Sequence, residues 1–243
     1  SVPKGEILQR KLVATEGKKV VFTDLEGTLL HPLTRSYTQA LDALRLLQSK
    51  GIAIIFCSAK TRSEQQVYRE ELDIKGPFIV ENGGAIFIPK DYFRFPFTYD
   101  KATDDYFVIE LGIPYQEIRQ RLKRINEEIN SHIVSFGDMS VEDVARETAF
   151  NLKSAELVKQ REYSEIIRIT GDKKSIGITL NSIKNSGLSY TSNGKFYEVM
   201  ERDGKSKAVQ ILTSYRFKAK SCLKLFKNSS LTIIFFNLPP FYF

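Results

Sequence analysis

The sequence predicts an α/β fold: a doubly wound, mostly parallel sheet forms the core, and an α+β domain is inserted into it. Two observations predict this class. Over the first 90 residues, short apolar runs alternate with amphipathic or polar segments, a pattern typical of a parallel sheet covered by helices. Beyond residue 90 this alternation stops, and helical and strand patterns mix, which indicates a separate insertion.

The predicted core strands are short runs rich in β-branched and aromatic residues, and they cover residues 20–23, 52–56 and 77–80. Residues 36–51 predict a helix, because leucine and alanine recur at helical spacing and a glycine stands where the helix should end. Residues 58–76, which follow the second predicted strand, are mostly polar and indicate a loop that leads into a second helix. Residues 81–89 predict a glycine turn into a further strand.

The inserted domain contains a strongly amphipathic helix. It is predicted over 114–130, where Ile118, Leu122, Ile125 and Ile129 share one face. Two strands, a helix and a hairpin are also predicted, at 106–111, 164–170, 175–187 and 188–200.

The domain boundaries follow from this change of pattern. Ser140 with Asp143 forms the pattern of a capping box, which predicts one more helix inside the insertion. We interpret residues 91–188 as the inserted domain, and we assign residues 1–90 and 189–243 to the core.

The net charge of +7 is confined to one end of the chain. Seven of the 36 basic residues and none of the 29 acidic residues fall in 204–243, so residues 1–203 are neutral overall. Because the chain also contains no DNA- or RNA-binding motif, we expect no nucleic-acid partner. The apolar run LTIIFFNLPPFYF at the C-terminus is far shorter than the roughly 20 residues that a membrane helix needs. We therefore expect no membrane partner.

The cysteine pattern and the first residues predict a cytoplasmic protein. Cys57 and Cys222 lie far apart without CxxC or Cys/His spacing, so they predict neither a disulfide framework nor a zinc site. Residues 1–19 contain no apolar core as long as that of a signal peptide. We expect a monomer or a homodimer that acts on a small molecule.

Polar residues follow each of the three predicted core strands. Asp24 and Glu26 follow the first strand, Ser58 follows the second and Glu81 follows the third. A buried charge is costly unless something pairs with it, so two acids at a strand end indicate a cation, a substrate or a simple turn. Ligands of parallel α/β sheets bind beyond the carboxyl ends of the strands. The sequence thus predicts a ligand site at this edge.

One of these clusters resembles a known motif. Residues 24–28, Asp-Leu-Glu-Gly-Thr, resemble the DxDGT motif of the haloacid-dehalogenase-like phosphatases. Four further segments are similar to segments of the mannosyl-3-phosphoglycerate phosphatase family and its glucosyl counterpart. They are FCSAKTRSE, PFIVENGGAIFIP, REYSE and GKFYEV, and the resemblance keeps the same order from about residue 19 to residue 215. The resemblance implies a core with an inserted α+β cap. It also implies Mg²⁺-dependent hydrolysis that releases mannosyl- or glucosylglycerate, a compatible solute.

The resemblance implies four catalytic residues. Asp24 would attack phosphorus and form an aspartyl-phosphate, and Glu26 would act as general acid and then as general base. Ser58 would donate a hydrogen bond to the phosphoryl group, and Lys205 would neutralise the phosphate and the nucleophile. Mg²⁺, which prefers oxygen ligands, would bind the Asp24 carboxylate and the backbone carbonyl of Glu26.

The resemblance also implies a set of substrate-binding residues near the junction with the insertion. Arginine suits a two-point contact with a carboxylate, and glycine permits a close backbone approach. The expected residues are Lys60, Arg62, Glu81, Asn82, Gly83 and Arg161.

The sequence departs from the family pattern at two places. Glu26 stands where the family has Asp, which adds one methylene to the predicted acid. The family also has an acidic loop that supplies a second carboxylate to Mg²⁺ after the helix that Lys205 opens, but this chain has no Asp or Glu after Asp203. The resemblance ends near Tyr215. We therefore expect an aberrant or truncated C-terminus, which puts the activity of this chain in doubt.

Two other functions stay open on the sequence. The first is a phosphatase of the same class with another substrate, such as sucrose phosphate or a general sugar phosphate. The second is a non-catalytic homologue that keeps the ligand pocket and lacks the acidic metal loop.

Overall fold

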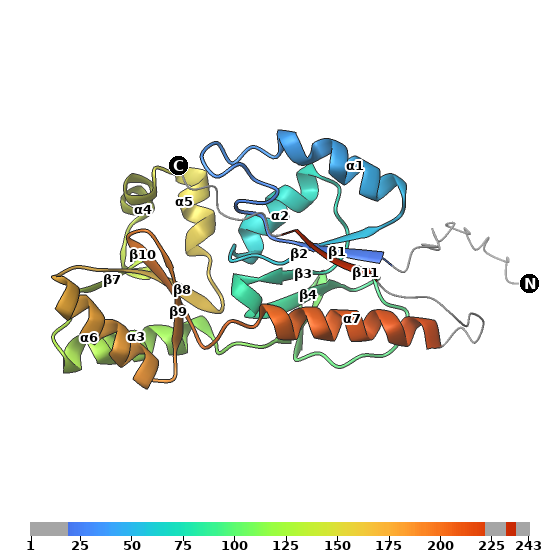
Figure 1. Cartoon of the computed structure of the whole chain (residues 1–243). Helices are drawn as coiled ribbons and strands as arrows, with labels where there is room; N and C mark the ends of the chain where they lie inside the picture. Colours follow the sequence, from blue (N-terminus) through green and yellow to red (C-terminus); the bar gives the residue numbers. More distant parts are fainter. Residues whose placement is uncertain (1–18, 222–231, 237–243) are drawn as a thin grey trace, which may run out of the picture.

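The computed structural model of the chain describes residues 19–221 and 232–236. These residues form two parts that lie side by side (Figure 1). In the core, a three-stranded and a four-stranded sheet are joined edge to edge by a bridge and together make up the core sheet, and the insert has a four-stranded sheet of its own. The predicted class, an α/β core with an inserted α+β domain, is confirmed.

The parallel half of the core sheet consists of β1 (Lys19–Thr23), β2 (Ala53–Phe56), β3 (Phe78–Val80) and β11 (Thr232–Phe236). β1 lies between β11 and β2 and runs parallel to both. A parallel bridge between Cys57 and Ile79 joins β2 to β3. The apolar run near the C-terminus thus supplies a strand beside β1. Within the predicted C-terminal tail, residues 222–231 and 237–243 lie outside the described residues.

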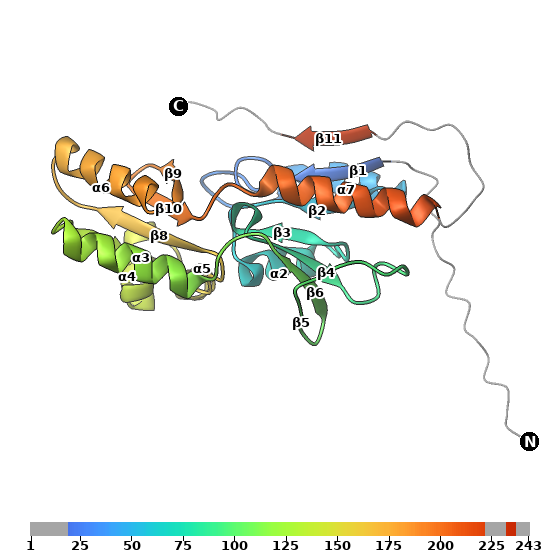
Figure 2. The same ribbon diagram turned by 90° about the horizontal axis from the view of Figure 1, so that it is seen from below.

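The other half of the core sheet is antiparallel. β3 is followed by β4 (Ala85–Pro89), β6 (Tyr106–Glu110) and the short β5 (Lys101–Ala102). Figure 2 shows β11 and β5 at opposite edges of the sheet. The prediction of a mostly parallel sheet therefore applies to the half that begins at β11 and ends at β3.

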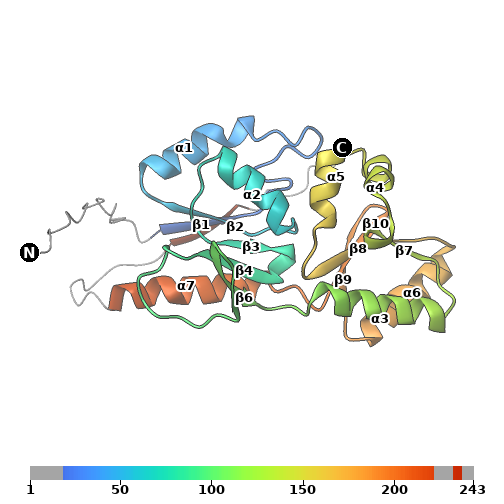
Figure 3. The ribbon, with the colours of Figure 1, turned by 180° about the vertical axis from the view of Figure 1, so that it is seen from behind.

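Helices cover both faces of the core sheet (Figures 1 and 3). On one face, α1 (Leu41–Ser49) and α2 (Arg62–Glu71) pack against the sheet, and Leu44 joins Phe56 in the apolar core. On the other face, α7 (Lys205–Ser221) buries Leu212 against Ile55. Neighbouring residues of β2 face opposite sides, as the alternation of a strand requires.

The insert is a four-stranded antiparallel sheet with helices packed on it. The strand order is β7 (Ile133–Ser135), β8 (Ser164–Ile169), β10 (Phe196–Met200) and β9 (Ser189–Asn193). The helices are α3 (Tyr115–Glu128), α4 (Val141–Thr148), α5 (Leu152–Lys159) and α6 (Lys173–Asn185). The predicted capping box is confirmed, because the Ser140 hydroxyl accepts a hydrogen bond from the Asp143 N–H at 3.0 Å.

The apolar face of α3 matches the prediction with one exception. Ile118, Leu122 and Ile125 are buried. Ile129 is 37% exposed because α3 ends at Glu128, so this side chain has left the helical face.

The sheets divide the chain differently from the predicted boundaries of 91 and 188. β6 pairs with β4 across the whole strand and buries Val108 in the core, so residues 101–110 belong to the core sheet. The hairpin of β9 and β10 pairs with β8, so residues 189–200 belong to the insert. By its hydrogen bonds, the insert therefore extends from about residue 111 to residue 200.

Within the described residues, no helix combines the length and the apolar character that a membrane crossing requires.

Candidate active site

Asp24 lies directly after β1, where the sheet presents its carboxyl ends. Its Oδ1 accepts a hydrogen bond from the Leu25 N–H at 2.7 Å, and its Oδ2 accepts one from Lys205 Nζ at 2.7 Å. The two side chains are 26% and 27% exposed, so the pair is partly open to solvent. Lys205 is the first residue of α7. The structure therefore brings together two residues that the sequence separates by 181 positions.

Lys205 is held as a cation by its surroundings. Burial alone lowers the pKa of Lys205, but the charge and the hydrogen bond of Asp24 raise that pKa above its ordinary value. The ammonium group thus stays charged at neutral pH and offsets the charge of the Asp24 carboxylate.

Glu26 is oriented by a buried lysine. Lys60 Nζ donates to Glu26 Oε1 at 2.9 Å and to Glu64 Oε1 at 3.0 Å. The Lys60 side chain is 6% exposed, whereas that of Glu26 is 48% exposed. Burial lowers the pKa of Lys60, but the two carboxylates outweigh burial and raise it above its ordinary value. Lys60, predicted to bind substrate, thus already has two carboxylate partners.

Glu64 is held in turn by the start of α2. The Thr61 hydroxyl accepts from the Glu64 N–H at 3.1 Å, and the Glu64 carboxylate accepts from the Thr61 N–H at 3.0 Å. This capping box fixes the second partner of Lys60.

Ser58 lies at the next strand end and is fully buried. Its N–H donates to the Ile79 carbonyl at 3.2 Å, and its hydroxyl accepts from the Lys60 N–H at 3.4 Å. The N–H of Cys57 donates to the Thr23 carbonyl at 2.9 Å, which holds the ends of β1 and β2 together. The structure thus places Ser58 at the same edge of the sheet as Asp24, as predicted.

The turn after β3 positions α7. Glu81, Asn82 and Gly83 all have positive φ, at 47°, 56° and 89°. The Asn82 carbonyl accepts from the Gly204 N–H at 2.8 Å. A Cβ on Gly83 would lie 2.1 Å from the Gly204 carbonyl carbon and 2.3 Å from the Lys205 nitrogen. Only glycine permits this contact, so Gly83 sets the place where α7 and its Lys205 begin.

Gly83→Ala is expected to lower the free energy of unfolding by about 2–3 kcal/mol, because the added methyl group forces the turn and α7 apart. Gly194→Ala is the matched control, since Gly194 also has positive φ, at 62°, and no atom lies within 4 Å of the place that its added methyl group would take. That control should cost only the backbone strain of about 1 kcal/mol. Urea denaturation of both variants measures the difference, and equal losses would contradict the role of the close approach.

A buried ionic network joins the core to the insert. Arg161 Nη2 donates to Glu198 Oε1 at 2.6 Å and to the Ala59 carbonyl at 3.0 Å, and Arg161 Nε donates to the Ser164 hydroxyl at 2.9 Å. The Arg161 side chain is 2% exposed. The Glu81 carboxylate accepts from the Ser164 hydroxyl at 2.7 Å. Arg161, predicted to face the substrate, therefore donates these hydrogen bonds to other residues of the protein.

The other predicted substrate residues also contact the insert. Glu81 accepts from the N–H groups of Glu162 and Tyr163 at 2.9 and 3.0 Å, and burial raises its pKa above the ordinary value. Asn82 Nδ2 donates to Glu198 Oε2 at 2.8 Å, and Arg62 Nε donates to Glu162 Oε1 at 2.9 Å. Their substrate roles stay predictions, whereas their role in joining the two parts is visible.

A cavity of about 620 Å³ lies between the core and the insert. Glu26, Gly27 and Lys60 line it from the core, and the insert adds Arg161 and Glu198 together with two aromatic side chains, Phe150 and Phe196. Sequence reasoning missed Phe150 and the core loop at 31–35, because they belong to none of the recognised segments. Phe196 lies in the recognised segment GKFYEV, but it was given no role there.

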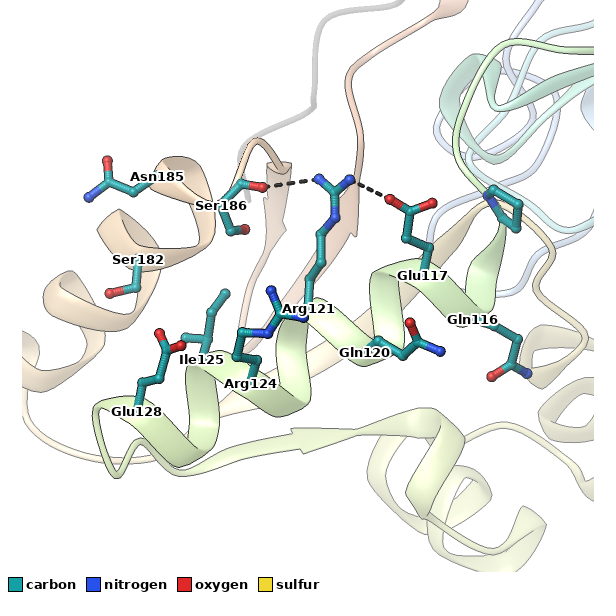
Figure 4. A pocket seen from close by; sticks show the side chains of 11 residues that line it. Gln116, Glu117, Gln120, Arg121, Arg124, Ile125, Glu128, Ser182, Asn185 and Ser186 are labelled. Atoms are coloured by element: carbon teal, nitrogen blue, oxygen red, sulfur yellow. Dashed lines mark hydrogen bonds and ion pairs between the residues drawn. The ribbon is translucent and has the colours of Figure 1, made fainter.

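A second, larger groove of about 990 Å³ runs between α3 and α6. Figure 4 shows Arg121 in it, held by Glu117 and by the Ser186 carbonyl. Only insert residues line this groove, and none of the predicted site residues is among them. We therefore place the substrate pocket in the smaller cavity, which Glu26, Lys60 and Arg161 line. Asp24, Ser58 and Lys205 are not among the residues that line it.

The donors beside Asp24 suit a cation that binds oxygen. Among the described residues, no group of three or more His, Cys, Asp or Glu side chains is arranged to hold a metal ion. The Asp24 carboxylate and the Glu26 carbonyl are the protein donors that the resemblance implies. Mg²⁺ commonly binds through one or two carboxylates and substrate phosphates while it keeps several waters, so this small donor set fits Mg²⁺.

Comparisons with known proteins agree with this geometry. Residues 21–218 match the haloacid dehalogenase-like hydrolase family. The chain is 43% identical over 196 residues to a glucosyl-3-phosphoglycerate/mannosyl-3-phosphoglycerate phosphatase of Methanococcoides burtonii, a match that covers 81% of this chain and 72% of that protein. It is 38% identical over 194 residues to a mannosyl-3-phosphoglycerate phosphatase of Pyrococcus furiosus, with 80% and 76% covered.

A solved structure supports the fold alone. A haloacid dehalogenase-like hydrolase from Bacteroides thetaiotaomicron superimposes with a TM-score of 0.58 at 15% identity, over 82% of this chain and 77% of that one. Together with the sequence matches, the Asp24–Lys205 pair at the end of β1 identifies the group to which the protein belongs. The chain is a member of the haloacid dehalogenase-like hydrolase family, and of the part of it that contains the mannosyl-3-phosphoglycerate phosphatases.

Proposed function

We propose that this protein is a Mg²⁺-dependent phosphatase that hydrolyses mannosyl-3-phosphoglycerate or glucosyl-3-phosphoglycerate through an aspartyl-phosphate. The observation that carries the proposal is the Asp24–Lys205 pair, in which Lys205 Nζ lies 2.7 Å from Asp24 Oδ2. Asp24 stands two residues before Glu26, which lines the cavity between core and insert. The names of the relatives from Methanococcoides burtonii and Pyrococcus furiosus support the substrate class.

The chain supplies the nucleophile, the acid and the base. An Asp24 oxygen attacks phosphorus while the bond from phosphorus to the glycerate oxygen breaks, and the Glu26 carboxyl group gives its proton to that leaving oxygen. Glu26 then accepts a proton from a water molecule that attacks the phosphoryl group, which frees phosphate and regenerates Asp24. Lys205 holds one Asp24 oxygen in place through both steps.

The remaining polar residues orient these groups. Lys60 fixes the Glu26 carboxylate beside the cavity. Mg²⁺, held by the Asp24 carboxylate and the Glu26 carbonyl, would supply the positive charge that lets a carboxylate approach a phosphate. Because few protein oxygens are available to it, we expect the metal to bind weakly and to depend on substrate.

Removal of the metal is expected to abolish turnover. Phosphate release from mannosyl-3-phosphoglycerate should fall about a hundredfold or more in EDTA and should return when Mg²⁺ is added in excess. Glucosyl-3-phosphoglycerate and sucrose phosphate, measured alongside, test the substrate class. Turnover that EDTA leaves unchanged would contradict the metal, and a preference for sucrose phosphate would contradict the proposed substrate.

Calorimetry tests the rival function, a non-catalytic ligand-binding protein. Titration of the phosphoglycerate ester into the protein with Mg²⁺ should show binding together with phosphate release. Binding without any phosphate release would favour the non-catalytic homologue.

A further inference from the structure

The cations that line the cavity differ in what they contact. Lys60 pairs with Glu26 and Glu64, as described above. Arg161 pairs with Glu198, which also lines the cavity. Lys195 Nζ pairs with Glu147 Oε2 at 2.8 Å. Each of these cations therefore has its charge offset by a carboxylate of the protein.

Arg35 lines the same cavity, and within the described residues it forms no ion pair. Its guanidinium carbon instead lies 3.7 Å from the centre of the Phe150 ring. Such a short approach to the ring centre places the planar group over the ring face, which leaves its N–H donors at the edge for another partner. Arg35 is thus a positioned cation whose charge is not offset by a carboxylate.

The backbone holds both members of this stack in place. Arg35 has a φ of 55°, its N–H donates to the His31 carbonyl at 2.8 Å, and the His31 N–H donates to the Ser36 carbonyl at 2.9 Å. Phe150 follows Ala149, which ends α4 with a φ of 56°. The arginine comes from the core and the phenylalanine from the insert, so the stack spans the two parts at the cavity.

The proposed substrate carries a second anionic group besides its phosphate, the carboxylate of the glycerate. We propose that Arg35 binds this carboxylate and so selects phosphate esters of an acid, an inference that rests on the proposed function. The guanidinium donates two parallel N–H bonds to the two carboxylate oxygens. Esters without the carboxylate leave this cation unpaired, and a site built for a polar group discriminates strongly against a ligand that lacks it.

Kinetics on two substrates test the inference. Arg35→Ala should lower kcat/KM for mannosyl-3-phosphoglycerate about 10- to 100-fold, mainly through KM, because it removes charged hydrogen bonds. It should leave kcat/KM for p-nitrophenyl phosphate, which has no carboxylate, within about twofold. Arg45→Ala, which removes the same charge from the exposed face of α1, is the matched control and should change neither value. Equal losses on both substrates would overturn the carboxylate assignment and would point to a phosphate contact.

A binding experiment keeps the inference separate from catalysis. 3-Phosphoglycerate and glycerol 3-phosphate differ only in whether a carboxylate or a hydroxymethyl group ends the chain. By calorimetry, the unmodified protein should bind 3-phosphoglycerate at least about tenfold more tightly, and Arg35→Ala should abolish the preference. If the preference exists and Arg35→Ala removes it while no phosphate is released, the inference holds and the proposed function fails. If the unmodified protein shows no preference, the inference is wrong.

Phe150 acts as a positioning residue, because it contacts the guanidinium face. Phe150→Leu should weaken the preference for 3-phosphoglycerate about two- to fivefold, as expected for loss of a partly exposed cation–π contact. Phe150→Tyr retains the ring and should restore the preference, a rescue that a purely packing role would not require. An unchanged preference in Phe150→Leu would contradict the positioning role.

Discussion

Asp24→Asn is expected to reduce phosphate release by about 10⁴-fold or more, as the loss of a covalent nucleophile does in other hydrolases. An amide is a poor nucleophile, and the substitution also removes the charge that pairs with Lys205 and that would bind the proposed metal. The amide oxygen can still accept the hydrogen bond from the Leu25 N–H. The fold should therefore remain, and the circular dichroism spectrum should match that of the unmodified protein.

Asp203→Asn is the informative control for this result. Asp203 lies close to the same lysine, and its Oδ1 accepts from the Lys205 N–H at 3.1 Å. Because its contact is to the backbone of α7, its loss should reduce turnover far less than the loss of Asp24. Substantial turnover in Asp24→Asn would rule out the aspartyl-phosphate, and an equal loss in Asp203→Asn would assign Asp203 to the reaction.

Arg161→Ala is expected to lower the free energy of unfolding by about 3–5 kcal/mol, because it leaves buried carboxylates without their counter-charge. Glu198 loses its partner at 2.6 Å, and Glu81 loses the guanidinium 3.7 Å away. Burial raises the pKa of both carboxyl groups, whereas Arg161 lowers it. Without the arginine these pKa values rise further, and the acids protonate or draw water into the junction.

Urea denaturation measures this loss, and Arg62→Ala provides the comparison. The Arg62–Glu162 pair also crosses from core to insert, but its side chains are 35% and 29% exposed. A pair so open to solvent should contribute only about 0–1 kcal/mol. If Arg161→Ala unfolds as easily as Arg62→Ala does, and only KM for the phosphoglycerate ester rises, then Arg161 binds substrate as the sequence suggested.

The sequence predicts the helices, the strands and the ends of the strands better than it predicts which strands pair with one another. Apolar runs and caps are local signals, so β1, β2, β3 and the capping box at Ser140 were all found. The strand pairing of residues 106–110 with β4, and of the hairpin with β8, is set by contacts far along the chain. A strand pattern carries no information about which sheet it will join, so the strand pairing divides the chain at residues other than the predicted boundaries.

In the candidate site, too, the sequence locates residues but does not show which residues contact one another. The motif after β1 located Asp24 and Glu26, and the resemblance supplied Lys205, whose contact with Asp24 the structure shows. The sequence could not show that Lys60, Arg62 and Arg161 each have a carboxylate within 3 Å. Basic residues near a ligand edge look alike in a sequence, whether or not a protein acid already offsets their charge.

The turn at residues 81–83 has a mechanical consequence. Its side chains are bonded to the insert, through Glu81 and Asn82, while its backbone is bonded to the start of α7. The turn therefore links the insert to the first residues of α7 through its own hydrogen bonds. We therefore expect a displacement of the insert relative to the core to reach Lys205, and we expect substitutions at this turn to change both the seating of the insert and the Asp24–Lys205 contact.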